Sequence, residues 1–397
     1  MQLKQQATNI VEHLLDNAQQ HHFAGDDPFD GLNTYIFRKI PALQDTLVGL
    51  AWTQLLKRSP INFRRLVGVP KERNPKGVAL FISGLLLEYQ RTQNVERLEQ
   101  AKELGEWLVD NMCDQQKWGA PCWGYHFPWK ARAFYVPLGK PNLITTVYVS
   151  QALFELGQIT EDEKLSQIAL ESADFIVNTL YQPLNEGDYF RYIPDEPALV
   201  HNANLWAAAW VLKSARLRGI SSHEKLAHKA CMTSIKAQQK DGSWPYGARA
   251  HHQFIDGFHT GYNLETLQIM QKEWQSEELQ TAIDKGFEYY KQALFTPEGI
   301  AKYYHNNVFP MDTHNFMQAV LTLLKIGKSQ SDLQLAESVI QQAIENLYLA
   351  EQKRFIYQKS STVTNRNDYI RWTQGWAYYA LNFYLTDLSQ RENSCNE

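Results

Sequence analysis

The chain has 397 residues, of which 44% are hydrophobic, and this is enough to bury a sizeable core. The net charge is −4 and no basic stripe is present, which argues against a nucleic-acid partner. No window of about 18 apolar residues marks a membrane span, and no unbroken apolar segment of a signal peptide begins the chain. The four cysteines lack metal or disulfide spacing, so we expect a reduced, cytoplasmic protein.

Apolar residues at three-to-four spacing predict helices along almost the whole chain. The expected helices cover roughly 2–20, 42–58, 77–91, 95–112, 143–156, 162–180, 203–216, 222–239, 261–273, 278–293, 313–326, 331–349 and 371–386. Strand signals are short and confined to loops, at 189–193 and 300–304. No linker rich in Pro, Gly and Ser divides the sequence, so we expect one domain over 1–397.

Two kinds of helix alternate. One kind is amphipathic, as in 222–239, and the other is apolar nearly all round, as in 203–216. A helix that is apolar all round is buried, and an amphipathic one lies outside it. The apolar helices begin at nearly even steps of 53 to 65 residues, near Gly77, Asn142, His201, His259, Asp312 and Arg371. The pattern predicts an all-α fold, an (α/α)6 toroid of six helical hairpins, with helix 2–20 in the outer ring. Helix 42–58 is surplus, and segment 21–76 is expected to be partly irregular and to cover one end.

The ends of the outer helices also repeat. The most distinct copy runs from Gln238 through Asp241-Gly242 to Trp244, and Tyr246 follows in the loop. Asp-Gly is an ordinary turn, and glutamine at a helix end satisfies backbone carbonyls. We interpret the glutamines as structural and keep Trp244 and Tyr246 as candidates for substrate binding.

This pattern resembles the α/α-toroid superfamily, which holds six-hairpin glycosidases, uronate lyases and epimerases, and terpenoid cyclases. Six motifs are similar to an exopolysaccharide-biosynthesis-cluster family of the VpsJ type: Asp27-Pro28-Phe29-Asp30-Gly31-Leu32-Asn33, Arg58-Ser59-Pro60-Ile61-Asn62, Asn74-Pro75-Lys76-Gly77, Trp123-Gly124-Tyr125, Pro141-Asn142 and Asp256-Gly257-Phe258-His259-Thr260-Gly261-Tyr262-Asn263. The region from Asp241 to Tyr262 also resembles glucuronyl C5-epimerase catalytic domains. These resemblances imply the fold and a sugar context, and leave the reaction open. A terpenoid cyclase is not expected, because no Asp-rich motif stands at the start of an inner helix.

Polar side chains gather where the inner helices begin, and in a toroid these positions share one mouth. They are Asn142; His201, Asn202 and Asn204; His259, Tyr262 and Asn263; and Asp312 with His314. Helix N-termini favour anionic or hydroxyl-rich ligands. Capping of the helices is the alternative, and it accounts for Asn142 and Asp312. Histidine is a mediocre cap, so three histidines at equivalent positions predict a functional pocket.

Two mechanisms fit these residues. In the first, His259 and Tyr262 act as base and acid on the carbon beside a uronate carboxyl, and Asn202, Arg132 or Arg371 stabilises the enolate-like intermediate. His201 is a further catalytic candidate. In the second, two carboxylates hydrolyse a glycosidic bond, and the candidates are Asp30, Asp241, Asp256 and Asp312, with Asp256 preferred.

The loop from Trp123 to Arg132 carries four aromatic residues and an arginine, as expected of a sugar-stacking platform or of a packed loop. Its binding candidates are Trp123, Tyr125, Trp129 and Arg132, and Trp372 beside Arg371 is another. A basic cluster formed by Arg64, Arg65, Lys71, Arg73 and Lys76 is interpreted as solvated surface. No zinc signature, P-loop or dinucleotide fingerprint occurs, so we expect neither a metal nor a cofactor.

The site residues favour a carbohydrate-active protein that works as an epimerase or lyase, and the resemblance implies a role in exopolysaccharide biosynthesis, on a uronate-containing or carrier-linked glycan. A glycoside hydrolase is the first alternative, and a non-catalytic glycan-binding or scaffold protein is the second. The expected partners are the carbohydrate and proteins of a biosynthetic complex.

Overall fold

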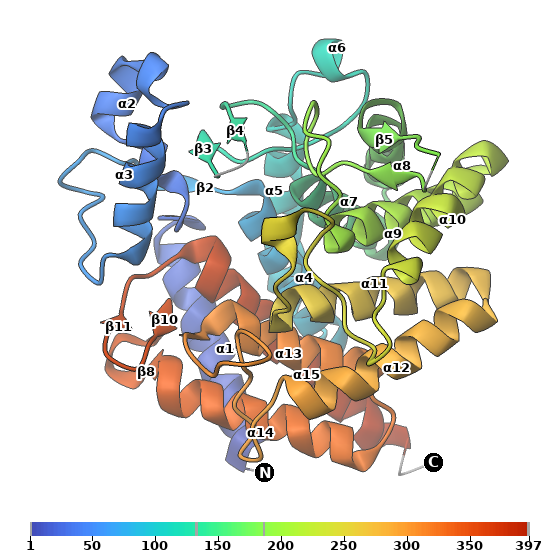
Figure 1. Cartoon of the computed structure of the whole chain (residues 1–397). Coiled ribbons are helices and arrows are strands. Elements are labelled where there is room, and N and C mark those ends of the chain that lie inside the picture. Colours follow the sequence, from blue (N-terminus) through green and yellow to red (C-terminus); the bar gives the residue numbers. More distant parts are fainter. Residues whose placement is uncertain (1, 132–133, 186, 395–397) are drawn as a thin grey trace.

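The computed structural model describes residues 2–131, 134–185 and 187–394, and its helices form two concentric rings (Figure 1). The inner ring consists of α4 (Pro75–Thr92), α7 (Leu143–Thr160), α9 (His201–Arg218), α11 (Gly257–Trp274), α13 (Thr313–Ile326) and α15 (Trp376–Ser394). The outer ring consists of α1 (Gln2–Gln20), α5 (Val95–Asp110), α8 (Glu163–Phe175), α10 (Ser221–Lys236), α12 (Glu277–Ala293) and α14 (Gln330–Leu347). Each inner helix packs on the next, and α15 packs back on α4, so the ring is closed. The predicted (α/α)6 toroid is confirmed.

Burial explains why the two kinds of helix alternate. In α9, fourteen residues from His201 to Ala215 are buried, because neighbours surround the helix on all sides. In α10, which lies outside it, only Ala227, Ala230, Cys231 and Ser234 are buried. Close approach within the inner ring relies on glycine at one point: a Cβ at Gly84 of α4 would lie 2.5 Å from the Tyr378 ring of α15. The inner helices therefore fill the core, and the outer helices cover it.

The outer ring is completed by the first helix of the chain. α1 packs against α15, and Lys4 of α1 forms an exposed ion pair with Glu392 at 2.7 Å. The last inner helix begins with a π-helical turn, η6 (Ile370–Gly375), which puts Arg371 and Trp372 at the mouth of the ring. A second π-helical turn, η3 (Ile176–Leu180), ends the expected helix 162–180.

Loops at the mouth carry only two-residue strands. The pairs are β1 (Ala24–Gly25) with β2 (Glu72–Arg73), β3 (Trp129–Lys130) with β4 (Tyr135–Val136), β5 (Tyr181–Gln182) with β6 (Tyr189–Phe190), and β8 (Tyr348–Leu349) with β9 (Arg354–Phe355). β7 (Met311–Asp312), β10 (Gln358–Lys359) and β11 (Thr364–Asn365) form a three-stranded sheet. The strand expected at 189–193 is β6, whereas 300–304 contains only isolated bridges at Ala301 and Tyr304. Short helical segments also occur in the loops, namely α6 (Gln115–Trp118), η4 (Ala250–His252) and η5 (Ala350–Gln352).

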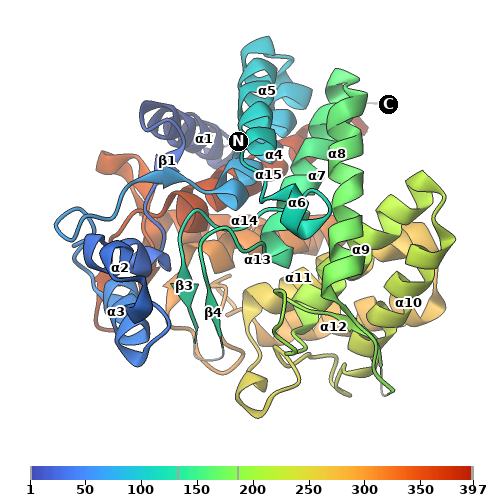
Figure 2. The ribbon, with the colours of Figure 1, turned by 90° about the horizontal axis from the view of Figure 1, so that it is seen from above.

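The segment between α1 and α4 lies beside the mouth, next to β3 and β4 (Figures 1 and 2). It contains η1 (Asp30–Asn33), α2 (Tyr35–Lys39), η2 (Pro41–Leu43) and α3 (Leu47–Arg58). The expected helix 42–58 is shorter than predicted, because Thr46 caps α3 through a hydrogen bond from the Gly49 amide. This additional helix, α3, lies outside the two rings and packs on η1 and β3.

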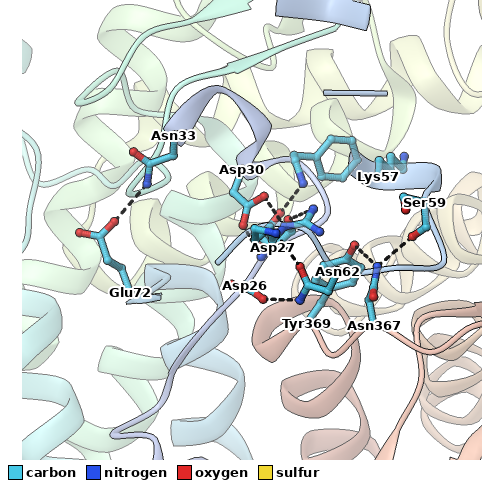
Figure 3. A network of polar contacts seen from close by, with 12 residues as sticks. Asp26, Asp27, Asp30, Asn33, Lys57, Ser59, Asn62, Glu72, Asn367 and Tyr369 are labelled. Atoms are coloured by element: carbon cyan, nitrogen blue, oxygen red, sulfur yellow. Dashed lines mark hydrogen bonds and ion pairs between the residues drawn. The ribbon is translucent and has the colours of Figure 1, made fainter. Parts of the chain in front are cut away.

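Polar contacts stabilise this segment and join it to the loop before the last inner helix (Figure 3). Asn62 donates to Asp26 at 2.7 Å, and Asn367 donates to the Ser59 carbonyl at 3.0 Å. Asn33 donates to Glu72 at 3.2 Å, within the segment itself. Among the described residues, no helix is long and apolar enough to cross a membrane.

Candidate functional site

The first turns of the inner helices converge on the mouth, and several begin with a side-chain cap. Asn74, Asn142, Asp256 and Asp312 cap α4, α7, α11 and α13 by accepting backbone N–H groups. Asp312 also accepts from Trp372 Nε1 at 3.2 Å and from Gln358 Nε2 at 2.6 Å. Asn142 and Asp312 therefore do act as caps.

Asp256 and His259 form an oriented pair at the start of α11. Asp256 Oδ1 accepts the His259 backbone N–H at 2.9 Å, while Oδ2 lies 2.7 Å from His259 Nδ1. One carboxylate thus caps the helix and fixes the imidazole ring. In a neutral ring whose Nδ1–H donates to Asp256, Nε2 of His259 is the nitrogen that can accept a proton. The His259 side chain keeps 21% of its surface exposed, whereas the Asp256 side chain keeps 2%.

Tyr262 and His314 form a second pair, deeper in the ring. Tyr262 lies one turn after His259, and its hydroxyl is 2.6 Å from His314 Nε2. The His314 ring stacks on Trp376, with centroids 4.5 Å apart. Burial lowers the pKa of His314 well below 6.5, and the charge of Lys76 lowers it further. Burial raises the pKa of Tyr262 well above 10. Both groups are therefore neutral, and they can hold or pass on a single proton.

Lys76 stands at the centre of this ring of aromatic side chains. It is 3% exposed, and its Nζ lies 4.1 Å from the Tyr148 ring centroid, 5.1 Å from that of Trp376 and 5.6 Å from that of Tyr262. No hydrogen bond or ion pair joins its Nζ to another described residue. Burial lowers the pKa of Lys76 well below 10.5, and the charge of Arg371 lowers it further. An anion bound among these aromatic rings would lie beside an amine that has no carboxylate partner.

Arg371 is held at the same mouth but is already paired. Its Nε and Nη2 donate to Asp27 at 2.6 and 2.8 Å, and both side chains are buried. The guanidinium also lies 4.7 Å from the Tyr125 ring centroid and 5.3 Å from that of Trp372. Trp372 in turn lies edge-on to His314 at 4.6 Å. Arg371 therefore links the N-terminal segment, the aromatic loop and the floor of the mouth.

Several buried polar atoms on the first turns have no hydrogen-bond partner among the described residues. They are Asn142 Nδ2, Asn202 Oδ1, Asn263 Oδ1, His314 Nδ1, Trp206 Nε1 and Trp376 Nε1. A buried polar group normally has a hydrogen-bond partner, so these atoms are available to a ligand or to ordered water. Mixed donors and acceptors between aromatic faces suit a ligand rich in hydroxyl groups.

Four of the predicted site residues bond into the wall of the ring. His201 Nδ1 lies 3.0 Å from Ser234 Oγ of α10, and Asn204 donates to the same oxygen at 2.8 Å. Trp244 Nε1 donates to the Ser234 carbonyl at 2.9 Å, and Trp123 Nε1 donates to the Leu108 carbonyl at 2.7 Å. His201 and Asn204 thus join α9 to the outer helix α10, whereas the two tryptophans join the loops after α10 and α5 back to those helices.

The remaining aromatic candidates lie between the wall and the mouth. Tyr246 is 4.5 Å from the His259 ring and stacks on Phe254 at 5.0 Å. Tyr125 stacks on Phe127 at 5.4 Å, and Trp129 belongs to the same small cluster. Arg132 lies outside the described residues. The loop thus forms a packed aromatic cluster that meets the mouth through Tyr125 and Arg371.

The carboxylates near the mouth do not form a free facing pair. Asp30 receives Arg64 Nε at 2.7 Å, Asp256 holds His259, and Asp312 is enclosed by Trp372 and Gln358. Asp241 accepts from Ser243 in its turn. Burial raises the pKa of Asp312 to about 6. Within the described residues, no group of three His, Cys, Asp or Glu side chains could hold a metal ion.

Lys76, Tyr148 and Trp376 were not predicted as site residues. The basic cluster that includes Lys76 was interpreted as solvated surface, which is wrong for Lys76 and for Arg64, since they are 3% and 1% exposed. Asn74 and Pro75 do indicate that Lys76 is a site residue, because a cap followed by proline places Lys76 in the first turn of an inner helix.

Comparison with known proteins supports the fold. No family model and no curated protein matches the chain. Among solved structures, a heparin-specific unsaturated glucuronyl hydrolase superposes with a TM-score of 0.65 at 13% identity, covering 98% of both chains. A cellobiose 2-epimerase from Spirochaeta thermophila gives 0.59 at 13% identity, covering 82% of this chain and 87% of its own. A GH76 α-mannanase from Bacteroides thetaiotaomicron gives 0.61 at 11% identity, covering 80% and 87%. The chain shares their toroidal fold.

Proposed function

We propose that this protein is a carbohydrate-active enzyme that removes a proton from the carbon beside a uronate carboxyl group, as an epimerase or a lyase. The Asp256–His259 pair is the observation that carries the proposal. A histidine whose Nδ1 is bound by a buried carboxylate presents a basic Nε2, and this one keeps part of its surface open.

Removal of that proton leaves an electron pair that moves onto the carboxyl oxygens. In the proposal, Lys76 stabilises this charge, because its buried amine forms no ion pair with any described carboxylate and lies among the aromatic rings of the site. Arg371 is less available, since Asp27 already occupies both donors that point to it. Asn202 and Asn263, whose Oδ1 atoms have no hydrogen-bond partner among the described residues, bind the ring hydroxyls.

Tyr262 and His314 supply the second proton carrier. If the tyrosine returns a proton to the opposite face of the same carbon, the product is an epimer. If the group on the neighbouring carbon leaves instead, taking the proton on its oxygen, the product is an unsaturated sugar. Both routes need the same base, so His259 is shared by them.

A glycan substrate is supported by the aromatic rings around the mouth and by the names of proteins with a similar fold, which include a glucuronyl hydrolase, an epimerase and a mannanase. The motifs similar to the VpsJ-type family favour a precursor of an exopolysaccharide, which would be carrier-linked. Cys113, Cys122 and Cys231 are unpaired, as in a reducing compartment such as the cytoplasm, where we place the reaction.

Solvent deuterium incorporation tests the proposal. The wild type and His259→Gln would be incubated in deuterated water with a panel of oligosaccharides containing glucuronate, galacturonate or mannuronate. Deuterium entering beside the carboxyl group in the wild type and not in His259→Gln supports proton abstraction. A changed sugar configuration then identifies an epimerase. A rise in ultraviolet absorbance that is also lost in His259→Gln identifies a lyase, because its unsaturated product keeps no hydrogen on that carbon.

The alternatives give different results in the same experiment. Reducing ends released with neither deuterium at carbon nor a rise in ultraviolet absorbance would indicate a glycoside hydrolase, with Asp256 and Asp312 as its carboxylates. Sugar binding with neither exchange nor cleavage, over the whole panel, would indicate a glycan-binding or scaffold protein. Either result would overturn the proposed reaction.

A further inference from the structure

The N-terminal segment exposes an unusual amount of apolar surface. Eight of its large apolar side chains are exposed, namely Tyr35, Ile36, Ile40, Leu47, Val48, Leu55, Ile61 and Leu66. Over the rest of the described chain only five others are as exposed: Val95, Leu138, Leu184, Leu217 and Val363. We call the eight residues the apolar face. Concentration of this kind marks an interaction site.

The apolar face surrounds a groove of about 910 Å³ between α2, α3 and residues 65–68. Thr53 and Leu56 of α3 are buried on the side toward η1, which leaves the opposite side of the helix without cover. Leu47 and Leu66 at the rim are 81% and 85% exposed. They protrude, whereas the anchors of a peptide-binding groove would be recessed.

Cations border the apolar face. Arg38, Lys39, Arg58, Arg65 and Lys71 are exposed, and no carboxylate of the described residues pairs with any of them. Of the nearby acids, Asp45 forms an ion pair with Lys130, and Glu72 accepts from the neutral amide of Asn33 and pairs with none of these cations. A chain with a net charge of −4 therefore concentrates unpaired positive charge at one place.

We propose that the apolar face and its cations dock this protein on an anionic lipid bilayer, as a peripheral protein. Protruding leucines insert among the acyl chains, while arginines and lysines meet the headgroups. A second copy fits less well, because a two-fold contact through this face would bring the cations of both copies together. The bilayer instead supplies the missing negative charge.

The docking places the mouth close to the lipid surface. The apolar face lies beside β3 and β4 on the same side of the ring (Figures 1 and 2), and α3 contacts β3. Asp27, a few residues before α2, is the partner of Arg371 at the mouth. The docking itself does not depend on which reaction the mouth performs.

Vesicle co-sedimentation tests the docking. The full chain would be spun with vesicles of phosphatidylcholine alone and with vesicles of equal parts phosphatidylcholine and phosphatidylglycerol. We expect binding to the anionic vesicles alone, weakening as salt is raised. The double variants Leu47→Ser/Leu66→Ser and Arg58→Gln/Arg65→Gln should each bind about tenfold more weakly.

Matched controls lie on other parts of the ring. Leu184→Ser/Leu217→Ser removes two other exposed leucines, and Lys225→Gln/Lys240→Gln removes exposed cations on and after α10, across the ring from α3 (Figure 2). These controls should bind like the wild type. Equal binding to both kinds of vesicle, no binding by the wild type, or undiminished binding by both test variants would overturn the proposal. So would a wild-type dimer that Leu47→Ser/Leu66→Ser converts to a monomer, because the second copy would then be the occupant.

Discussion

Arg371 donates two hydrogen bonds to Asp27, of 2.6 and 2.8 Å, although the two residues are 344 positions apart in the sequence. Both side chains are buried, so loss of one partner would leave an unpaired charge inside the protein. The pair fastens the N-terminal segment to the mouth and holds Arg371 against Tyr125.

Removal of that charge pair should be costly. We expect Asp27→Asn to lower the free energy of unfolding by about 3–5 kcal/mol, since it leaves Arg371 without its carboxylate. The exposed pair of Lys4 and Glu392 provides the control, and Glu392→Gln should cost less than about 1 kcal/mol. Urea unfolding followed by circular dichroism measures both. Equal small losses in the two variants would mean that water already compensates the buried arginine.

The Asp256 carboxylate should matter more for rate than for folding. Asp256→Asn keeps an oxygen to cap α11 but no longer fixes the His259 tautomer, so turnover should fall about 10²- to 10⁴-fold. The cost in stability should stay within about 2 kcal/mol. Asp312→Asn is the matched control, because Asp312 caps α13 and does not touch His259. Turnover in the deuterium-exchange assay would separate them, and an equal loss in both variants would speak for the paired-carboxylate hydrolase.

Lys76 should take up a proton when an anionic sugar binds. Burial holds the pKa of its amine well below 10.5 in the free protein, and a carboxylate beside it would raise that pKa again. Calorimetric titration with glucuronate in two buffers of different ionisation enthalpy counts the protons taken up. We expect net uptake that is lost in Lys76→Met, and affinity that falls as the pH rises. Uptake unchanged in Lys76→Met would assign the proton to another group, such as His259.

His201 should make the protein sensitive to acid. Burial lowers the pKa of His201 from 6.5 to about 4, so the unfolded chain binds the proton more readily than the folded one. The free energy of unfolding is therefore highest above pH 6.5, where His201 is neutral in both the folded and the unfolded chain. Protonation of the unfolded chain at His201 lowers it by about 3 kcal/mol as the pH falls toward 4. Denaturant unfolding of wild type and His201→Gln across this range should show a smaller loss in the variant. His21→Gln, at an exposed position, should leave the wild-type dependence unchanged.

The ring itself could be predicted because its signal is local. Each inner helix shows apolar residues on all sides, each outer helix shows them on one, and the caps Asn142 and Asp312 stand where the helices begin. The direction of a side chain within the first turn is a different matter. His201 is the first residue of α9 and His259 is the third residue of α11, and one bonds to Ser234 in the wall whereas the other faces the mouth.

The sequence pattern also could not predict contacts between residues that lie far apart in the chain. Nothing near Asp27 in the sequence indicates that Arg371 would meet it, and Lys76 resembles its exposed basic neighbours until the helix cap beside it is considered. The apolar face of 35–66 was likewise not foreseen, because an amphipathic helix such as α3 is expected to bury its apolar side. These features depend on which elements meet in space.

Closure of the ring through α15, α4 and α1 carries a cost during biosynthesis. The ribosome releases α4 long before it has made α15, and until then the Gly84 side of α4 has no Tyr378 to cover it. The contacts of α15 with α4 and α1 can therefore form only after nearly the whole chain has been made.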